Sequence, residues 1–378
     1  MQGDGSAYFL YHSIGQYPGK AQDLAQAMAG FAASWAAPDD LQWGYALGKR
    51  QGFIDRWRDL IGAAEGTLTT TENVTAALYA VIGALPAGHL AGRTLLVAGD
   101  CFPSLHFLLA GLAPRFGFTL KTVPLRPGAH WVQDEDVIAA WGPDVALALL
   151  TWVSSISSHR SDISALVAHG RAQGSLIGVD VTQAVGLLPF DVNAPAVDFA
   201  VSTSLKWMCG TPGAGMLYVA PALIAASQPE FRGWFSQPNP FSWDLDKFAY
   251  APDIRRYDNG TPSVMSAVMS LPAMDWHAAQ DKPALLAHTQ RLGERLMQAM
   301  EGLDVTFATP RAKDQRGGSV MVKLPPEKPA APIIVSLRAQ GIAADARDQL
   351  MRFSPGNMTT DDGVNRLIAA LEQAIGSR

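Results

Sequence analysis

The sequence predicts an α/β protein with a mainly parallel β-sheet covered by helices on both faces, followed by a smaller α+β domain. Strands that are apolar throughout are typical of a sheet buried on both faces. Helical patterns separate five such segments, at residues 94–99, 145–151, 175–180, 198–202 and 215–220. The pattern changes near Met265, and 378 residues are more than one hydrophobic core usually holds.

Helical periodicity accounts for most of the remaining chain. It precedes and separates the strands of the large domain at residues 21–37, 45–64, 73–85, 104–116 and 162–173. After Met265 it recurs at residues 266–280, 284–300, 331–340 and 359–375, with candidate strands at 304–308, 318–324 and 349–354. We therefore expect a large domain over residues 21–262 and a small domain over residues 263–378, with the segment 1–20 packing near the small domain.

Composition and charge exclude several classes of protein. A formal net charge of −5 argues against binding to nucleic acid, and no apolar run is long enough to span a membrane. Two cysteines, Cys101 and Cys209, are too few for a disulfide framework, and the eight histidines show no metal-ligand spacing. The first residues lack the basic and apolar parts of a signal peptide. We expect a cytoplasmic protein without a metal.

Polar residues follow several of the predicted strands. Thr151 ends one strand, Asp180 ends the next with Gln183 three residues later, and Thr203 and Lys206 follow a third. Ligands of open α/β sheets bind beyond the carboxyl ends of the strands. These side chains are therefore expected on one rim, to which the strand at 94–99 adds Phe102 and the helix at 73–85 adds Thr75 and its N-terminal amides.

Such a rim suits a phosphorylated pyridine aldehyde. Lys206 lies between Leu205 and Trp207, whose apolar side chains disfavour the charged form of the amine and make it a better nucleophile for a Schiff base. A carboxylate can keep the pyridine nitrogen protonated, an aromatic ring can stack on the cofactor, and a helix N-terminus with hydroxyls can hold the phosphate.

A known family shows the same order of motifs. The run "GVDVTQAVGLLPFDVNAPAVDFAVSTSLKWMCGTPGAGMLYV" resembles the core signature of the class V aminotransferase group of fold-type I pyridoxal-phosphate enzymes, with Asp180, Gln183 and Lys206 at the family spacing. Six further segments resemble segments of this family along most of the chain; they are "YHSIGQYP", "TTTENVTAAL", "CFPS", "RGWF", "NGTPS" and "LMRFSP". Of these, "YHSIGQYP" and "RGWF" resemble segments of the kynureninase-like branch.

The resemblance implies a fold with a seven-stranded, mainly parallel sheet and assigns roles to individual residues. Lys206 would form the Schiff base with pyridoxal 5'-phosphate (PLP), and Asp180 would pair with the pyridine nitrogen. Arg352 would bind the α-carboxylate of an amino-acid substrate, and Thr261 would reach the phosphate of a neighbouring subunit in a homodimer with shared active sites. The residues implied to bind the cofactor are Lys206, Asp180, Gln183, Asn73, Val74, Thr75, Phe102, Thr151, Thr203, Trp234 and Thr261.

Some of these residues also have simpler explanations. Asp180, Asn73 and Thr75 are residue types that cap helices, and Phe102 could belong to the core. Trp234 could be a partly buried turn residue, and His12 could line the site or lie at the surface. Arg352 could be a strand-edge arginine, with Arg347 available nearby to replace it.

Three positions depart from the family pattern. Gln183 stands where kynureninases usually have His, Leu205 where related branches have Tyr or His, and Leu105 where an Asp is expected three residues after the stacking Phe. No cysteine follows Cys209, which argues against a cysteine desulfurase. A kynureninase-like C–C or C–S lyase or hydrolase is the first expectation. A class V aminotransferase, an isopenicillin N epimerase-like racemase and a non-catalytic protein of the same fold are the alternatives.

Overall fold

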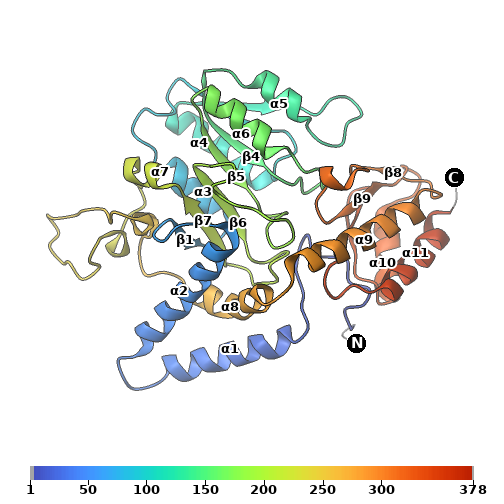
Figure 1. Cartoon of the computed structure of the whole chain (residues 1–378), viewed down its shortest axis with the longest axis horizontal. Helices are drawn as coiled ribbons and strands as arrows, with labels where there is room; N and C mark the ends of the chain where they lie inside the picture. The colour runs from blue at the N-terminus through green and yellow to red at the C-terminus, as the bar shows by residue number, and fades with distance from the viewer. Residues whose placement is uncertain (1–3, 377–378) are drawn as a thin grey trace.

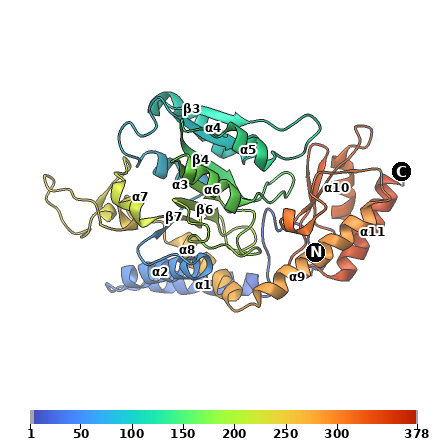
Figure 2. The same cartoon turned by 45° about the horizontal axis from the view of Figure 1, so that its top comes forward.

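The computed structural model describes residues 4–376 and contains two β-sheets, each with its own helices (Figure 1). Residues 1–3 of the predicted N-terminal segment and residues 377–378 of the predicted small domain lie outside the described part. The larger sheet forms the centre of the molecule, and the smaller sheet lies to one side with the C-terminal helices (Figures 1 and 2).

The large sheet has seven strands in the order β1-β7-β6-β5-β4-β2-β3. β7 alone runs in the direction opposite to the other six strands, so the predicted seven-stranded, mainly parallel sheet is confirmed. Its strands are β1 (Leu68–Thr71), β2 (Thr94–Ala98), β3 (Thr119–Val123), β4 (Val145–Thr151), β5 (Leu176–Asp180), β6 (Phe199–Thr203) and β7 (Gly215–Val219).

Helices cover both faces of this sheet, as the apolar strands require. On one face, the buried side chains of β4 and β5 pack against α2 (Gln42–Ile61), α5 (Asp134–Ala140), α6 (Ile163–Ala172) and α8 (Met265–Ala278). On the other face, the core is completed by α3 (Val74–Ile82), α4 (Pro103–Phe116) and α7 (Pro221–Ala226).

The smaller sheet is antiparallel, in the order β10-β11-β9-β8, and has its own hydrophobic core. Its strands are β8 (Thr306–Phe307), β9 (Val320–Lys323), β10 (Asp345–Arg347) and β11 (Leu350–Phe353). The helices of this part are α9 (Lys282–Met300), α10 (Ala330–Ala339) and α11 (Asp361–Ile375). Residues 4–376 also contain three short 3-10 helices; they are η1 (Trp234–Ser236), η2 (Ile254–Tyr257) and η3 (Lys313–Gln315).

The predicted boundary between the domains at residues 262/263 stays a prediction. Helix α8 packs on α2 and on α1 (Lys20–Trp35), and its Ala267 and Met274 belong to the core of the large sheet. This packing favours a boundary after α8. Within residues 4–376, no helix combines the length and the apolar character needed to cross a membrane.

The N-terminal segment connects the two parts of the molecule. Tyr8 and Leu10 form single β-bridges with Ala343 and Ser354 of the small domain. Farther along, the Gly15 amide donates to the Leu205 carbonyl in the large domain at 2.9 Å. The segment thus reaches the loop that carries Lys206 after contacting the small sheet.

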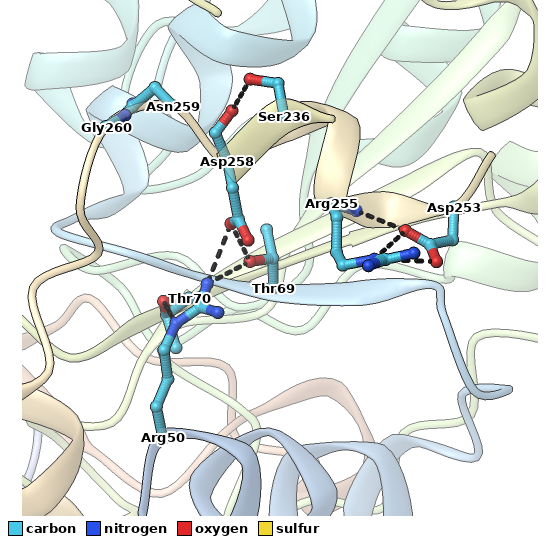
Figure 3. A network of polar contacts seen from close by, with 9 residues as sticks. All are labelled: Arg50, Thr69, Thr70, Ser236, Asp253, Arg255, Asp258, Asn259 and Gly260. Atoms are coloured by element: carbon cyan, nitrogen blue, oxygen red, sulfur yellow. Dashed lines mark hydrogen bonds and ion pairs between the residues drawn. The ribbon is translucent and has the colours of Figure 1, made fainter. Parts of the chain in front are cut away.

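A long segment over residues 228–262 leaves the large domain and returns to it, and it projects from the body of the molecule (Figures 1 and 2). A buried polar network holds its returning end (Figure 3). The Arg50 guanidinium forms an ion pair with Asp258, with 2.9 Å between Nη2 and Oδ1, and also donates to the Thr69 and Thr70 hydroxyls of β1. Ser236 Oγ donates to the Asp258 carbonyl, which links the two ends of the segment.

We predict that Asp258→Asn lowers the free energy of unfolding by about 3 kcal/mol, because it leaves the buried Arg50 charge without its counter-ion. Urea unfolding measures the change. Asp253→Asn is the matched control, because Asp253 forms a more exposed ion pair with Arg255 in the same segment and should change stability by no more than about 1 kcal/mol. An equal decrease in the free energy of unfolding in both variants would contradict the importance assigned to the buried Arg50–Asp258 pair.

Candidate active site

The ends of three neighbouring parallel strands bring the central polar residues together. Thr151 at the end of β4 is in register with Asp180 at the end of β5, and Asp180 is in register with Val201 of β6, which ends at Thr203. The sequence therefore correctly predicted their common edge. This follows from the parallel arrangement, in which all carboxyl ends meet at one side of the sheet.

Asp180 is buried at this edge, and burial raises the pKa of its carboxyl. The Thr182 amide donates to Asp180 Oδ1 at 2.9 Å, and the positive charge of Lys206 also favours the ionised form, so both partly oppose the effect of burial. Because the backbone donates to only one of its two oxygens, the Asp180 carboxylate can still accept a hydrogen bond from another group.

Lys206 keeps part of its surface open to solvent, but its amine is surrounded by protein atoms. Desolvation lowers the pKa of the amine to about 8; Arg352 and Arg347 add to this decrease, whereas Asp180 opposes it. Among the described residues, no side chain or carbonyl forms a hydrogen bond or ion pair with Lys206 Nζ. The amine is thus partly uncharged near neutral pH and free to react.

Phe102 precedes helix α4 and faces this amine. Lys206 Nζ lies 5.5 Å from the centre of the Phe102 ring. The Arg347 guanidinium carbon lies 5.9 Å from the same ring centre, although Arg347 belongs to the small domain. The ring therefore stands where the two domains meet.

The start of helix α3 lies at the same edge of the sheet, because β1 runs parallel to β6 and leads into it. Asn73 Oδ1 accepts from the Ala76 amide at 2.8 Å, so the Asn73 side chain is a helix cap. The amides of Val74 and Thr75 have no partner among the described residues. Free amides at a helix N-terminus are donors suited to a phosphate.

Thr203 and Gln183 are oriented by hydrogen bonds to the backbone. The Leu205 amide donates to Thr203 Oγ1 at 3.3 Å, which leaves the hydroxyl proton of Thr203 free to be donated. Gln183 is buried, and its Nε2 donates to the His12 carbonyl at 3.1 Å. The Gln183 side chain is therefore positioned by the N-terminal segment.

Two other predicted residues, Trp234 and Thr261, belong to the projecting segment over residues 228–262. Trp234 packs edge-on against Phe235 and Phe241 on the projecting segment. Thr261 is exposed and lines a cavity of about 420 Å³ together with residues of β1 and α3, among them Thr71 and Ala76 on either side of the start of α3. Neither contacts Lys206, so any role of Trp234 and Thr261 in cofactor binding remains a prediction.

Arg352 is close to Lys206, but its guanidinium is already paired. Its Nε donates to Asp345 Oδ1 at 2.9 Å, and its Nη2 contacts the other carboxylate oxygen. His12, also buried, lies with its Nε2 3.0 Å from Asp345 Oδ1 and its Nδ1 2.7 Å from Ser354 Oγ. Sequence reasoning missed Asp345, because no apolar pattern marks the short strand β10.

These features fit the phosphorylated pyridine aldehyde that the sequence suggested. Lys206 offers an amine without a partner, Asp180 a buried carboxylate, and Val74 and Thr75 two free amides. The buried Thr151 hydroxyl also lacks a hydrogen-bond partner, as expected for a group awaiting a ligand. The chemistry of this donor set matches the aldehyde, ring nitrogen, phosphate and ring hydroxyl of PLP.

Comparisons with known proteins agree with this fit. The family model described as aminotransferase class-V matches residues 54–367. A kynureninase of Pseudomonas fluorescens is 28% identical over 366 residues, which are 93% of this chain and 84% of the relative. A kynureninase of Burkholderia pseudomallei (strain K96243) is 26% identical over 365 residues, or 92% of this chain and 84% of the relative.

Solved structures share the fold along nearly the whole chain. A cysteine desulfurase from Thermococcus onnurineus NA1 superposes with a TM-score of 0.85 at 18% identity, covering 98% of this chain and 94% of the other. The cystine C–S lyase C-DES, in complex with cysteine persulfide, has a TM-score of 0.85 at 19% identity, covering 97% of each chain. At these identities the similarity concerns the fold.

The lowered pKa of Lys206 predicts an unusual pH dependence of its reactivity in the cofactor-free protein. Only the uncharged amine reacts with an acylating reagent, so modification should rise with a midpoint near pH 8 instead of near the ordinary lysine value of 10.5. Mass spectrometry of the peptide containing Lys206 follows the reaction. The same peptide in denatured protein is the control, and equal midpoints in the two states would contradict the prediction.

Proposed function

Because this chain belongs to the aminotransferase class-V family and is a PLP-dependent enzyme, we propose that it is a kynureninase-like lyase or hydrolase that breaks a C–C or C–S bond in the side chain of an amino acid. The observation that carries the proposal is the similarity to kynureninases over 93% of the chain. The Gly233–Phe235 segment, which resembles a kynureninase motif, supports the same branch of the family.

The residues of the site have separable roles in this proposal. PLP, when bound, supplies an electron sink that weakens the bonds at the Cα of an amino acid. Lys206 would hold the cofactor's aldehyde and, as an amine with a pKa near 8, could later carry a proton at Nζ. Asp180 would hold the proton of the pyridine nitrogen, and the amides of Val74 and Thr75 would hold the phosphate.

The cysteines argue against desulfurase chemistry. A desulfurase needs a thiolate that attacks the sulfur of its substrate. Cys101 and Cys209 are both buried, and burial raises the pKa of each thiol to about 12. Both side chains therefore remain protonated near neutral pH, and neither is suited to that role.

We predict that the protein reconstituted with PLP gains a visible absorption band and converts at least one amino acid of a defined panel. The panel contains L-kynurenine, L-alanine, L-aspartate and a cysteine S-conjugate. Alanine from kynurenine indicates C–C cleavage, and pyruvate from the conjugate indicates C–S cleavage; a new keto acid or a racemised substrate would instead support an aminotransferase or an epimerase and contradict the proposal.

Lys206→Ala is the control for this experiment. It should abolish the hydroxylamine-sensitive absorption band and turnover, because the amine that would bind the aldehyde is lost. Unchanged absorption in Lys206→Ala would disprove the assignment of the lysine. A wild-type protein that takes up no PLP would contradict the proposal as a whole.

We further propose that the enzyme is a homodimer in which Thr261 reaches the site of the second chain. Helix α1 has no buried residue in the single chain, although it carries Met28 and Trp35 among its exposed side chains. The projecting segment likewise exposes Trp243 and Leu245, at 79% and 96%. Large exposed apolar surfaces of this kind are typical of protein interfaces.

Light scattering should therefore give about twice the mass of one chain. The double substitution Trp243→Ser and Leu245→Ser should shift the protein towards the monomer, because it removes apolar contact area from the proposed interface. Phe107→Ser, at an exposed position of α4, serves as the matched control and should leave the mass unchanged. A fully active wild-type monomer would rule out shared active sites.

A further inference from the structure

A cavity of about 540 Å³ lies where helix α8 ends and helix α9 begins, and we call it the α9 pocket. Helix α9 leads from this point to the small sheet (Figure 1). The rim residues Pro189 and Ala194 are exposed, so the pocket opens to solvent. A volume of this size with a mainly apolar lining is typical of a site for a small molecule. The apolar side chains that form most of the lining are Leu60, Leu187, Leu188, Phe190, Pro283 and Leu286.

The α9 pocket is distinct from the site around Lys206 but adjoins it. The described residues that line it include neither Lys206 nor Asp180. Its wall packs against the Lys206 loop, since a Cβ at Gly186 would lie 2.6 Å from Met208 Sδ and 3.0 Å from the Trp207 carbonyl carbon. A ligand in the pocket would therefore contact the segment that supports the Lys206 loop without entering the site of the amine.

Two polar side chains of the lining already bind the backbone of the pocket wall. His277 Nε2 donates to the Gly186 carbonyl at 2.6 Å, and desolvation lowers the pKa of this imidazole to about 4, so it is uncharged near neutral pH. Asp191 Oδ1 accepts from the backbone amide and the side-chain amide of Asn193, at 2.8 and 3.0 Å. These two groups hold the wall in place.

Lys282 is the cation of the lining, and its charge is not compensated. Its Nζ makes one long hydrogen bond, 3.5 Å to the Gln280 carbonyl, and it forms no ion pair with any carboxylate in residues 4–376. Desolvation lowers the pKa of the amine, because the neighbouring apolar side chains replace water. The ordinary lysine pKa of 10.5 lies far above neutral pH, so the amine still carries its charge there.

The stability of helix α9 does not explain a lysine at this position. Lys282 is the first residue of the helix, where the helix dipole makes a positive charge unfavourable. The preceding Asp281 already caps the helix, since its Oδ1 accepts from the Ala284 amide at 3.0 Å. A bound anion would compensate the lysine charge that the protein itself leaves unpaired.

We propose that the α9 pocket binds a carboxylic acid with an apolar body, whose carboxylate pairs with Lys282 and whose aliphatic or aromatic part fills the cavity. A single lysine suits a head group with one charge, whereas a phosphate favours several donors. The inference goes beyond the proposed function and does not depend on it, because the pocket takes no residue from the site around Lys206.

Calorimetric titration of two acids and their amides into the full-length, PLP-loaded protein tests this inference. The acids are octanoate and indole-3-propionate, and the amides have the same bodies without the charge. The wild type should bind one or both acids more tightly than the corresponding amide, and the preferred body distinguishes an aliphatic from an aromatic ligand. Lys282→Gln should reduce this preference roughly 10-fold, as expected for the loss of a charge-assisted hydrogen bond. Lys282→Glu should abolish binding of the acids and retain binding of the amides.

Both Lys282 variants should fold, because they remove a cation from a helix N-terminus, where Glu is favourable. Melting curves verify this. Lys313→Gln is the matched control; Lys313 is an exposed lysine of η3 that does not line the pocket, so the preference for the acids should stay unchanged. An unchanged preference in both Lys282 variants would overturn the inference, as would a wild type that binds neither acid.

Failure of the proposed function gives a different result. In that case the wild type takes up no PLP, and the same titrations into the protein as purified should still show binding that depends on Lys282. Normal uptake of PLP without such binding would contradict this inference alone.

Discussion

The burial of charge at the junction of the two domains is the constraint on which the site depends. Lys206, Arg347 and Arg352 bring three positive groups close to Asp180 and Asp345. Asp345 neutralises Arg352 directly, whereas Lys206 receives only long-range compensation from Asp180, and desolvation then favours its uncharged form. The fold thus leaves the Lys206 amine without a direct carboxylate partner, and this favours its reactive, uncharged form. An amine in a close ion pair would stay protonated and unreactive. Both domains are needed, since neither alone carries all five groups.

The N-terminal segment maintains this junction. The His12 carbonyl accepts from Gln183 of the large domain, while the His12 ring contacts Asp345 and Ser354 of the small domain. Gly15 then packs against the Lys206 loop so closely that a Cβ at this position would lie 1.9 Å from the Lys206 carbonyl oxygen. Because that neighbour is backbone, only glycine permits the contact. One short segment therefore positions the residues on both sides of the reactive amine.

The sequence predicted the buried strands and the residues at their ends, because hydrophobic patterning and chain direction determine both. It missed β1, β3 and β10, which are short and rich in polar residues and so lack an apolar pattern. The pairing of Asp345 with Arg352 was missed for the same reason, since it depends on the register of a hairpin whose first strand was not recognised. The sequence similarly identified Asn73 as a possible cap or ligand, but only the structure shows its bond to the Ala76 amide. The pairing of side chains across two strands depends on the register of those strands, which the sequence does not show. The residues at the ends of the strands can instead be read directly along the sequence.

Leu205 departs from the family pattern in a way that bears on the proposed homodimer. Related branches have a hydrogen-bonding Tyr or His there, but the Leu205 side chain offers no donor, and its amide is used by Thr203 Oγ1. Under the proposed function, the donors that this chain retains for the phosphate are the amides of Val74 and Thr75 and the hydroxyl of Thr203. A phosphate carries up to two negative charges and favours several hydrogen-bond donors. The loss of one donor, at position 205, therefore increases the importance of the remaining donors. In the proposed homodimer, Thr261 of a second chain would supply such a donor, and Leu205 would then make the site more dependent on its partner than Tyr or His would.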